Sequence, residues 1–302
     1  MPKTSIIITT FSRPKYLPRA VESAFAAGSD VEVIVVDDAS TDATSEVCRS
    51  LEEIKYIRLE ENQGTARARN IGIEASQGEY IAFHDDDDRR LPGSVDGLAA
   101  ILDADPAAGL AYGQIWAGDE NLEPVGDPFP TEFIQGDVFW RIVEANFIPT
   151  IGTVFRKSCL SEVGMVNPDL VGVDDYDLWI RISEQYRILA LEKPVGIWRQ
   201  ALANSGQGSS DKVLEAVRTN AVSNRALDTL PRAANDPDRR EKAREGIRQR
   251  TSQFLYWYAS EQYKEGHLKD SRKSILAALR FNIKPVFHPT VMRMLLRSFL
   301  PV

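Results

Sequence analysis

Hydrophobic residues in the first third of the chain gather in short continuous runs. The runs occupy residues 5–9, 31–36, 56–59 and 80–83. Each is bounded by turn or charged residues and is too short for a buried helix, which predicts a buried β-strand. Between the runs, apolar residues recur at helical spacing near residues 17–28, 42–51 and 65–76. Strands that alternate with helices of about 10–15 residues indicate βαβ units, so we expect an α/β domain with a mostly parallel, twisted sheet flanked by helices.

The pattern continues to about residue 205 and then changes. Further strands are expected at residues 109–116, 154–157 and 188–191. The stretch 119–133 is rich in Pro, Gly and acids and predicts a loop. Three long stretches of helical periodicity follow, at residues 211–228, 239–263 and 267–281. We therefore expect an α/β domain over residues 1–205 and an all-helical C-terminal region over 206–302.

Four consecutive carboxylates, Asp85 to Asp88, directly follow the apolar run at 80–83. They are expected at the carboxyl end of a strand, which is where open α/β sheets bind ligands. Adjacent carboxylates repel one another, so either some stay protonated or a cation joins them. A site whose ligands are all oxygen atoms favours Mg²⁺ or Mn²⁺. Mg²⁺ usually also binds oxygens of substrate phosphates. A solvated acidic loop is the alternative. A calcium loop of the EF-hand type is disfavoured, because Arg89 and Arg90 follow the acids and the glycine that such a loop requires is missing.

A second acidic cluster, made of Asp174, Asp175 and Asp177, precedes an apolar pattern of helical period. The cluster is expected at the N-terminus of that helix. Carboxylates there are candidates for general acid–base chemistry. Stabilisation of the helix dipole alone is the alternative interpretation.

Composition limits the classes of protein that the chain can represent. Hydrophobic residues make up 43% of the 302 residues and charged residues 26%, which is typical of a soluble globular protein. The net charge of −8 argues against a nucleic-acid-binding protein. Cys48 and Cys159 form no CxxC pair, so neither a disulfide framework nor a zinc site is expected. We expect a cytoplasmic protein without a signal peptide or a membrane-spanning helix.

The last 32 residues are basic and partly apolar. They contain six basic residues and no acid: Arg272, Lys273, Arg280, Lys284, Arg293 and Arg297. Apolar residues interleave with the last of them, which suits a helix on the anionic inner face of a membrane and predicts peripheral membrane contact. A basic helix packed on an acidic part of the protein is the alternative.

Six segments in order resemble the family 2 glycosyltransferases, whose nucleotide-sugar-binding domain has the GT-A fold. They lie at residues 8–13, 36–42, 62–72, 83–88, 152–164 and 174–179. The segment 83–88 stands at the place of the family's DxD metal motif. The resemblance covers about residues 3–205 and implies a nucleotide-diphosphate sugar as donor and Mn²⁺ or Mg²⁺ as cofactor.

The resemblance also assigns roles to residues. It implies that the nucleotide sugar is bound by Thr9, Thr10, Phe11, Arg13, Asp38, Arg69, Asn70, Asp85 and Asp86, with Asp38 on the nucleobase. It implies that Asp85 and Asp87 hold the metal and that Asp175 is the general base. In two places the chain departs from the family: Asp174 stands where Glu is usual, and no His follows Trp198 and Arg199, which leaves the third metal ligand open.

These features together predict an inverting glycosyltransferase. It would move a sugar to a hydroxyl of a glycan, a lipid-linked glycan or a polysaccharide. A nucleotidyltransferase on a similar sheet, a phospho-accepting receiver domain with Asp37 and Asp38, and a non-catalytic nucleotide-sugar-binding relative are the alternatives. The segment 9–15 contains no glycine, which disfavours the nucleotidyltransferase.

Overall fold

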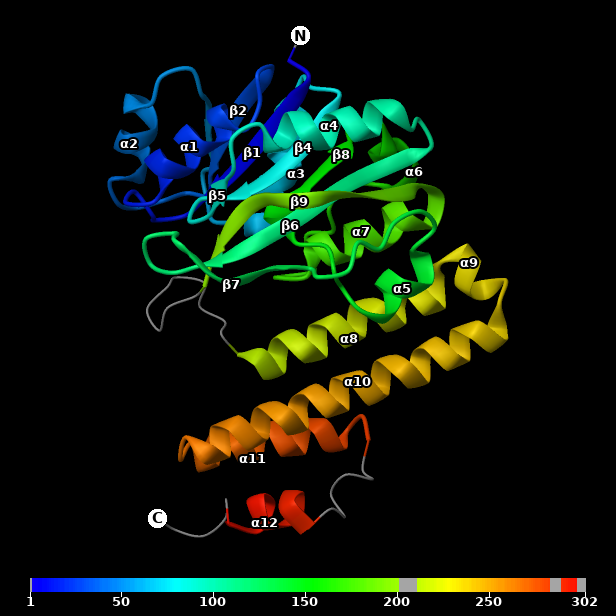
Figure 1. Cartoon of the computed structure of the whole chain (residues 1–302). Helices are drawn as coiled ribbons and strands as arrows, with labels where there is room; N and C mark the ends of the chain where they lie inside the picture. The colour runs from blue at the N-terminus through cyan, green and yellow to red at the C-terminus, as the bar shows by residue number, and fades with distance from the viewer. Residues whose placement is uncertain (1, 201–210, 283–288, 298–302) are drawn as a thin grey trace. The chain divides into compact units, whose positions relative to one another are not determined.

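A computed structural model of the chain describes residues 2–200, 211–282 and 289–297 (Figure 1). The chain divides into two compact units. The first consists of Met1–Ile142 and Asn146–Ser205, and the second of Val143–Ala145 and Gly206–Val302.

The first unit is built on one mixed sheet with nine strands among the described residues. The strands are β1 (Thr4–Thr10), β2 (Val31–Asp37), β3 (Lys55–Arg58), β4 (Tyr80–Asp85), β5 (Arg89–Arg90), β6 (Ala108–Gly118), β7 (Pro124–Phe129), β8 (Thr153–Arg156) and β9 (Arg187–Arg199). Neighbouring strands are hydrogen-bonded in the order β3-β2-β1-β4-β8-β6-β9-β5. The strand β7 stands outside this order and pairs with β6. All the strands expected from apolar runs are confirmed.

The expected parallel sheet is found in the N-terminal half. β3, β2, β1 and β4 are all parallel neighbours. β8 then runs antiparallel to both β4 and β6, and β6 and β9 are parallel to each other. The sheet is therefore mixed, with β8 antiparallel to both of its neighbours after a short 3₁₀ turn (Thr150–Gly152).

Seven α-helices are described before residue 200, and several of them flank the sheet (Figure 1). They are α1 (Leu17–Ala26), α2 (Thr44–Ser50), α3 (Thr65–Ala75), α4 (Ser94–Ala104), α5 (Phe139–Glu144), α6 (Leu160–Val163) and α7 (Asp174–Gln185). A second 3₁₀ turn covers Lys157–Cys159. Two differences from the sequence-based expectation appear: β7 forms inside the stretch 119–133, which was expected to be a loop, and the short elements α5 and β5 had no periodic signal.

Alternating side chains of the central strands pack on opposite faces of the sheet. Ile6 and Ile8 share a core cluster with Leu17 of α1 and with residues of α4. Ile7 faces the other way, toward α3, where a Cβ on Gly72 would lie 2.4 Å from its Cγ2 atom. The helix α3 can thus approach β1 closely only because residue 72 is glycine.

The aromatic residues on that second face connect the sheet to α7. Phe83 and Phe155 meet edge to face at 5.3 Å between ring centroids, and Trp179 of α7 lies 5.5 Å from Phe155. Trp179 is fully buried. This cluster fixes the start of α7, and with it the second acidic cluster, relative to β4.

The second unit is helical in its described residues. It contains α8 (Lys212–Thr229), α9 (Pro231–Ala234), α10 (Pro237–Lys264), α11 (Leu268–Leu279) and α12 (Pro289–Arg297), as expected from the helical periods. Leu255 and Ala259 of α10 pack with Ile275 of α11 and Met294 of α12. Asp211 accepts hydrogen bonds from the first backbone N–H groups of α8, which caps the helix. In the part of the chain that the structure describes, no helix has the length and apolar character needed to cross a membrane.

Candidate active site

The carboxyl ends of β1, β2 and β4 lie side by side. Thr9 stands opposite Asp85 of β4, and Thr10 stands opposite Asp37 of β2. The backbone N–H of Asp38 donates to the Thr10 carbonyl at 2.9 Å. Parallel register therefore brings three predicted segments together at one edge of the sheet, where α/β proteins bind ligands.

Three of the four carboxylates after β4 are buried. Asp86, Asp87 and Asp88 are each 2% exposed, whereas the Asp85 side chain is 34% exposed. Burial raises the pKa of Asp86 to about 7, although Arg13 and Thr10 act against the rise. Burial also raises the pKa of Asp87 and of Asp88, and the charge of Asp85 adds to both effects. The site is therefore short of positive charge and favours a cation or a proton.

Arg13 supplies part of that positive charge. Its Nη1 atom lies 2.9 Å from Asp86 Oδ1 and 3.0 Å from Asp87 Oδ2. The Thr10 hydroxyl donates to the other oxygen of Asp86 at 2.6 Å. Thr10, Arg13 and Asp86, all predicted to bind the nucleotide sugar, thus form one connected group. Phe11 stands beside them with 47% of its surface exposed, so its ring is available to a ligand.

Arg69 joins the two acidic clusters. Its Nη2 atom donates to Asp85 at 3.0 Å and its Nη1 atom donates to Asp174 at 2.7 Å. The guanidinium also lies 4.9 Å from the centre of the Phe83 ring. Burial alone would lower the pKa of Arg69, but the carboxylates of Asp174 and Asp85 outweigh it and raise that pKa. A buried, fully charged arginine thus connects the end of β4 to the start of α7.

Asp175 is half-buried at the start of α7 and is held by two donors. Its carboxylate accepts hydrogen bonds from the Thr150 hydroxyl and from the Tyr176 backbone N–H. Burial and the charge of Asp174 raise its pKa, while Arg69 and Thr150 act in the opposite direction. A carboxylate with a raised pKa is a better proton acceptor than an ordinary one, which is what a general base requires.

Two residues that are predicted to bind the nucleotide form hydrogen bonds with the protein's own backbone. Both oxygens of Asp38 accept backbone N–H groups, from Gln63 at 2.7 Å and from Gly64 at 2.8 Å. The amide of Asn70 forms a pair of hydrogen bonds with the Val166 backbone, at 2.8 and 3.0 Å. Asp38 therefore orients the start of α3, and Asn70 anchors the segment around Val166. Their contact with a nucleotide stays a prediction.

Residues that the sequence analysis assigned no role also shape the site. Arg199, at the end of β9, donates its backbone N–H to Asp88 at 2.9 Å and its Nε to the Asp87 carbonyl at 3.0 Å. Thr150 orients Asp175. The aromatic–Arg pair Trp198–Arg199 in the sequence could have identified Arg199 as a site residue. Nothing in the sequence around Thr150 marks it as one.

His84 and Arg90 lie behind the acidic turn. Both are buried, and Arg90 donates to the carbonyls of Phe83 and Thr153, each at 3.0 Å. Burial and the charge of Arg90 lower the pKa of His84 to about 3. His84 is thus neutral at pH 7 and has a packing role, and Arg90 ties β4 to β8.

The described residues contain no preformed metal-binding cluster. Over residues 2–200, 211–282 and 289–297, no three His, Cys, Asp or Glu side chains converge to form a metal-binding group. Asp85 faces Arg69, and Asp87 faces Arg13. An ion at Asp85 and Asp87 would need further oxygen ligands from phosphates or water.

Comparison with known proteins places this geometry in a family. The model of the family "Glycosyl transferase family 2" matches residues 5–163. That match contains β1, β2, β4 and the acidic turn, and it ends before Asp175. The chain is 33% identical over 207 residues to the succinoglycan biosynthesis protein ExoU of Rhizobium meliloti, covering 61% of this chain and 58% of that protein.

A second relative is the GalNAc(5)-diNAcBac-PP-undecaprenol beta-1,3-glucosyltransferase of Campylobacter jejuni. It is 39% identical over 198 residues, which is 61% of each chain. An uncharacterized glycosyltransferase of Nostoc, alr2836, is 30% identical over 178 residues, 55% of this chain and 54% of that protein. The matches thus span little more than half the length of these curated relatives.

Solved structures support the same fold. The crystal structure of S. aureus TarS 1-349 superposes with a TM-score of 0.63 at 19% identity, covering 98% of this chain and 89% of that chain. Its complex with UDP-GlcNAc has a TM-score of 0.56 at 18% identity, covering 92% of each chain. At this level of identity the likeness concerns the fold, and it confirms the expected GT-A type with a helical C-terminal region.

Proposed function

Because the chain belongs to glycosyl transferase family 2, we propose that it moves a sugar from a nucleotide-diphosphate sugar to an acceptor hydroxyl and inverts the anomeric carbon. One observation carries the proposal. Arg69 connects Asp85, at the predicted diphosphate site, with Asp174, the neighbour of Asp175. A donor site and a proton acceptor in one ionic network are what direct transfer to a hydroxyl requires.

The donor would lie at the carboxyl ends of β1, β2 and β4. Thr9, Thr10, Phe11 and Arg13 follow β1, and Asp38 follows β2. The exposed ring of Phe11 and the guanidinium of Arg13 suit a nucleotide that carries negative charge. Structural neighbours were crystallised with UDP and UDP-GlcNAc, so a uridine-diphosphate sugar is the first donor to test.

Asp85 and Asp87 fit a divalent ion through the chemistry of their donor atoms, which are carboxylate oxygens only. Asp85 is one-third exposed and can reach a bound diphosphate, while buried Asp87 supplies charge that Arg13 balances only in part. Mn²⁺ or Mg²⁺ held there would neutralise the diphosphate that leaves. In this proposal, oxygens of the sugar donor's diphosphate or of water take the place of a third protein ligand to the metal.

Asp175 would take the proton from the acceptor hydroxyl. Thr150 and the Tyr176 N–H hold its carboxylate in one orientation. The hydroxyl oxygen then attacks the anomeric carbon from the side opposite the diphosphate, which inverts that carbon. Burial and the charge of Asp174 raise the pKa of Asp175, which makes its carboxylate a stronger proton acceptor.

The acceptor is proposed from the relatives and from the last helix. One relative is named for succinoglycan biosynthesis and another for transfer to an undecaprenol-linked glycan, which makes a lipid-linked or polysaccharide acceptor the first choice. On α12, Met292 and Leu296 are exposed together with Arg293. We place this face on an anionic membrane surface at the cytoplasmic side. Lys284 of the predicted basic segment lies outside the described residues.

A donor screen tests the proposal. Thermal unfolding of the full chain is measured with UDP-glucose, UDP-GlcNAc and GDP-mannose, each with and without Mn²⁺, followed by a transfer assay on lipid-linked and soluble glycans. A donor at about 100 times its Kd should stabilise the protein by about 2.7 kcal/mol. Stabilisation by none of the donors in either condition would overturn the proposed function.

A further inference from the structure

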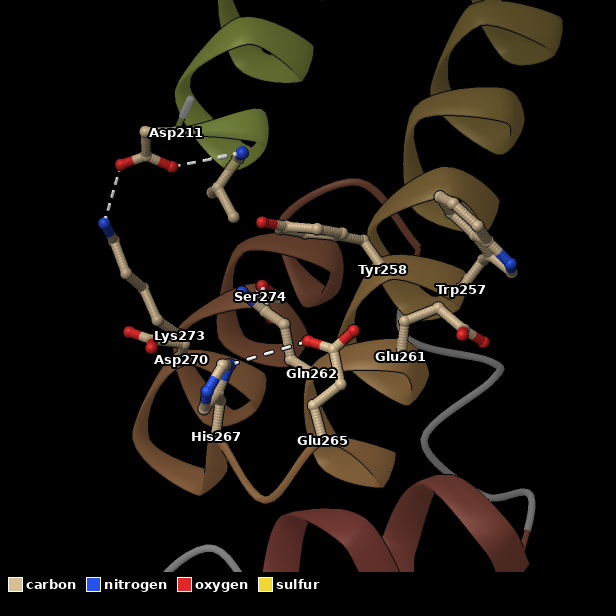
Figure 2. Close-up of a pocket in the computed structure, with 11 residues that line it drawn as sticks. Asp211, Trp257, Tyr258, Glu261, Gln262, Glu265, His267, Asp270, Lys273 and Ser274 are labelled. Atoms are coloured by element: carbon tan, nitrogen blue, oxygen red, sulfur yellow. Dashed lines mark hydrogen bonds and ion pairs between the residues drawn. The ribbon is translucent and has the colours of Figure 1, made fainter. Parts of the chain in front are cut away.

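The helical unit contains a pocket whose lining residues take no part in the candidate active site. Its volume is about 790 Å³, and its walls come from the start of α8, the end of α10 and the start of α11 (Figure 2). Small-molecule sites in proteins typically occupy about 300–1,000 Å³. The pocket, called here the α10–α11 pocket, is thus large enough for several linked rings and belongs to one unit of the chain.

One wall of the pocket is aromatic. Trp257 of α10 lines it and is 58% exposed. Phe254 supports this wall, because its ring lies 5.8 Å from that of Trp257 and stacks on Tyr258 at 6.2 Å. Figure 2 shows the Tyr258 side chain extending from α10 toward Asp211 and Lys273. Exposed aromatic rings held in place by one another offer a flat apolar surface to a ligand.

The opposite wall is polar and contains the amide of Gln262. Gln262 is 9% exposed, and its Oε1 atom accepts a 2.6 Å hydrogen bond from Ser274. Gln262 is one of the residues that line the pocket. Its amide can therefore form hydrogen bonds with a ligand in the pocket.

The charge of the pocket limits the chemistry of that ligand. The acidic residues that line it are Asp211, Glu261, Glu265 and Asp270. The lining cation Lys273 is bonded to Asp211 at 2.7 Å. The excess of carboxylates disfavours phosphates and nucleotides, so we expect a ligand without negative charge. Carboxylates accept hydrogen bonds well from neutral hydroxyl groups.

A sugar chain has these complementary properties. A pyranose ring presents a face of C–H groups that packs on an aromatic ring and a rim of hydroxyls that donate to carboxylates and accept from amides. We propose that the α10–α11 pocket binds a neutral oligosaccharide segment of the acceptor glycan, an assignment that rests on the proposed function. Holding the acceptor by a second segment raises its effective concentration and increases affinity for long acceptors over short ones.

Binding of defined tetrasaccharides to the full chain tests this proposal. The probes are maltotetraose, cellotetraose and laminaritetraose, measured by calorimetry or by saturation-transfer NMR. At least one should bind with a Kd of about 1 mM. Trp257→Ala and Glu261→Gln should each weaken that binding about tenfold or more, because the first removes the aromatic surface and the second replaces a charged hydrogen-bond acceptor by a neutral amide. The matched controls are Leu276→Ala, an exposed apolar residue on α11, and Glu245→Gln on α10, neither of which lines the pocket.

The outcomes separate this proposal from the proposed function. Binding of UDP with Mn²⁺ should be unchanged in all four variants, and thermal unfolding shows that each is folded. Tetrasaccharide binding without nucleotide binding would leave the pocket assigned and remove the transferase proposal. If no tetrasaccharide binds, if Trp257→Ala binds as the parent does, or if tetralysine binds and the sugars do not, the oligosaccharide assignment is overturned.

Discussion

Arg69 donates a 2.7 Å hydrogen bond to Asp174 across 105 residues of sequence. Both side chains are nearly inaccessible, at 6% and 4% exposure. This bond fixes the start of α7 against α3, and so it determines where the neighbouring Asp175 stands. The predictions below begin with this pair.

Replacing Arg69 with Ala should destabilise the protein by about 3–5 kcal/mol, since it leaves the buried carboxylate of Asp174 unpaired. Urea denaturation measures the change. Arg67→Ala is the control, because Arg67 is exposed on the same helix and should change stability by no more than about 0.5 kcal/mol. Equal effects of the two substitutions would show that the bond to Asp174 is unimportant.

Asp87→Ala should abolish the Mn²⁺-dependent part of nucleoside-diphosphate binding, because it removes a proposed metal ligand. Calorimetry with UDP, with and without Mn²⁺, gives the measurement. Glu22→Gln changes an exposed acid of α1 and should leave binding intact. Full metal dependence in Asp87→Ala would move the metal site to other residues.

Asp175→Asn should retain donor binding and lower transfer by roughly 10²–10⁴-fold, the usual contribution of a general base. Calorimetry and a turnover assay with the donor found in the screen separate the two effects. A variant that transfers at the parental rate would make Asp175 a helix-start acid only, and Asp174 or Asp177 would be tested next.

The pH profile of transfer tests the role of Thr150. A base must be ionised, so activity should fall as the pH drops through the raised pKa of Asp175. Thr150→Val removes a hydrogen bond that lowers this pKa, and the acid limb should therefore move to higher pH. Thr150→Ser keeps the hydroxyl and serves as the control. A limb that stays in place, or moves down, contradicts the assignment.

Gly72→Ala should destabilise the first unit by about 1–3 kcal/mol, because the new Cβ would lie 2.4 Å from Ile7. Gly246→Ala in α10 is a matched control, where the nearest atom is the Arg250 side chain at 3.7 Å. Alanine there should stabilise the helix by about 0.5–1 kcal/mol. Thermal unfolding of both variants decides whether the close approach of α3 to β1 is needed.

The sequence by itself determined the order of strands and helices, because hydrophobic periodicity is a local property of the chain. It also determined that Asp85 ends a strand and that Asp175 begins a helix. Both facts follow from neighbouring residues. Six short segments in order resemble the family 2 glycosyltransferases, and this resemblance indicated the family and the fold correctly.

Only the tertiary structure decided which of these residues meet. Arg69 contacts Asp85 and Asp174, Asn70 bonds to Val166, and Arg199 holds the Asp85–Asp88 turn. The partners lie from 16 to 111 residues apart, so no local pattern encodes them. The pKa shifts belong here as well, since burial in the assembled core is their leading cause. A carboxylate's chemistry depends on what surrounds it, and that environment exists only in the folded chain.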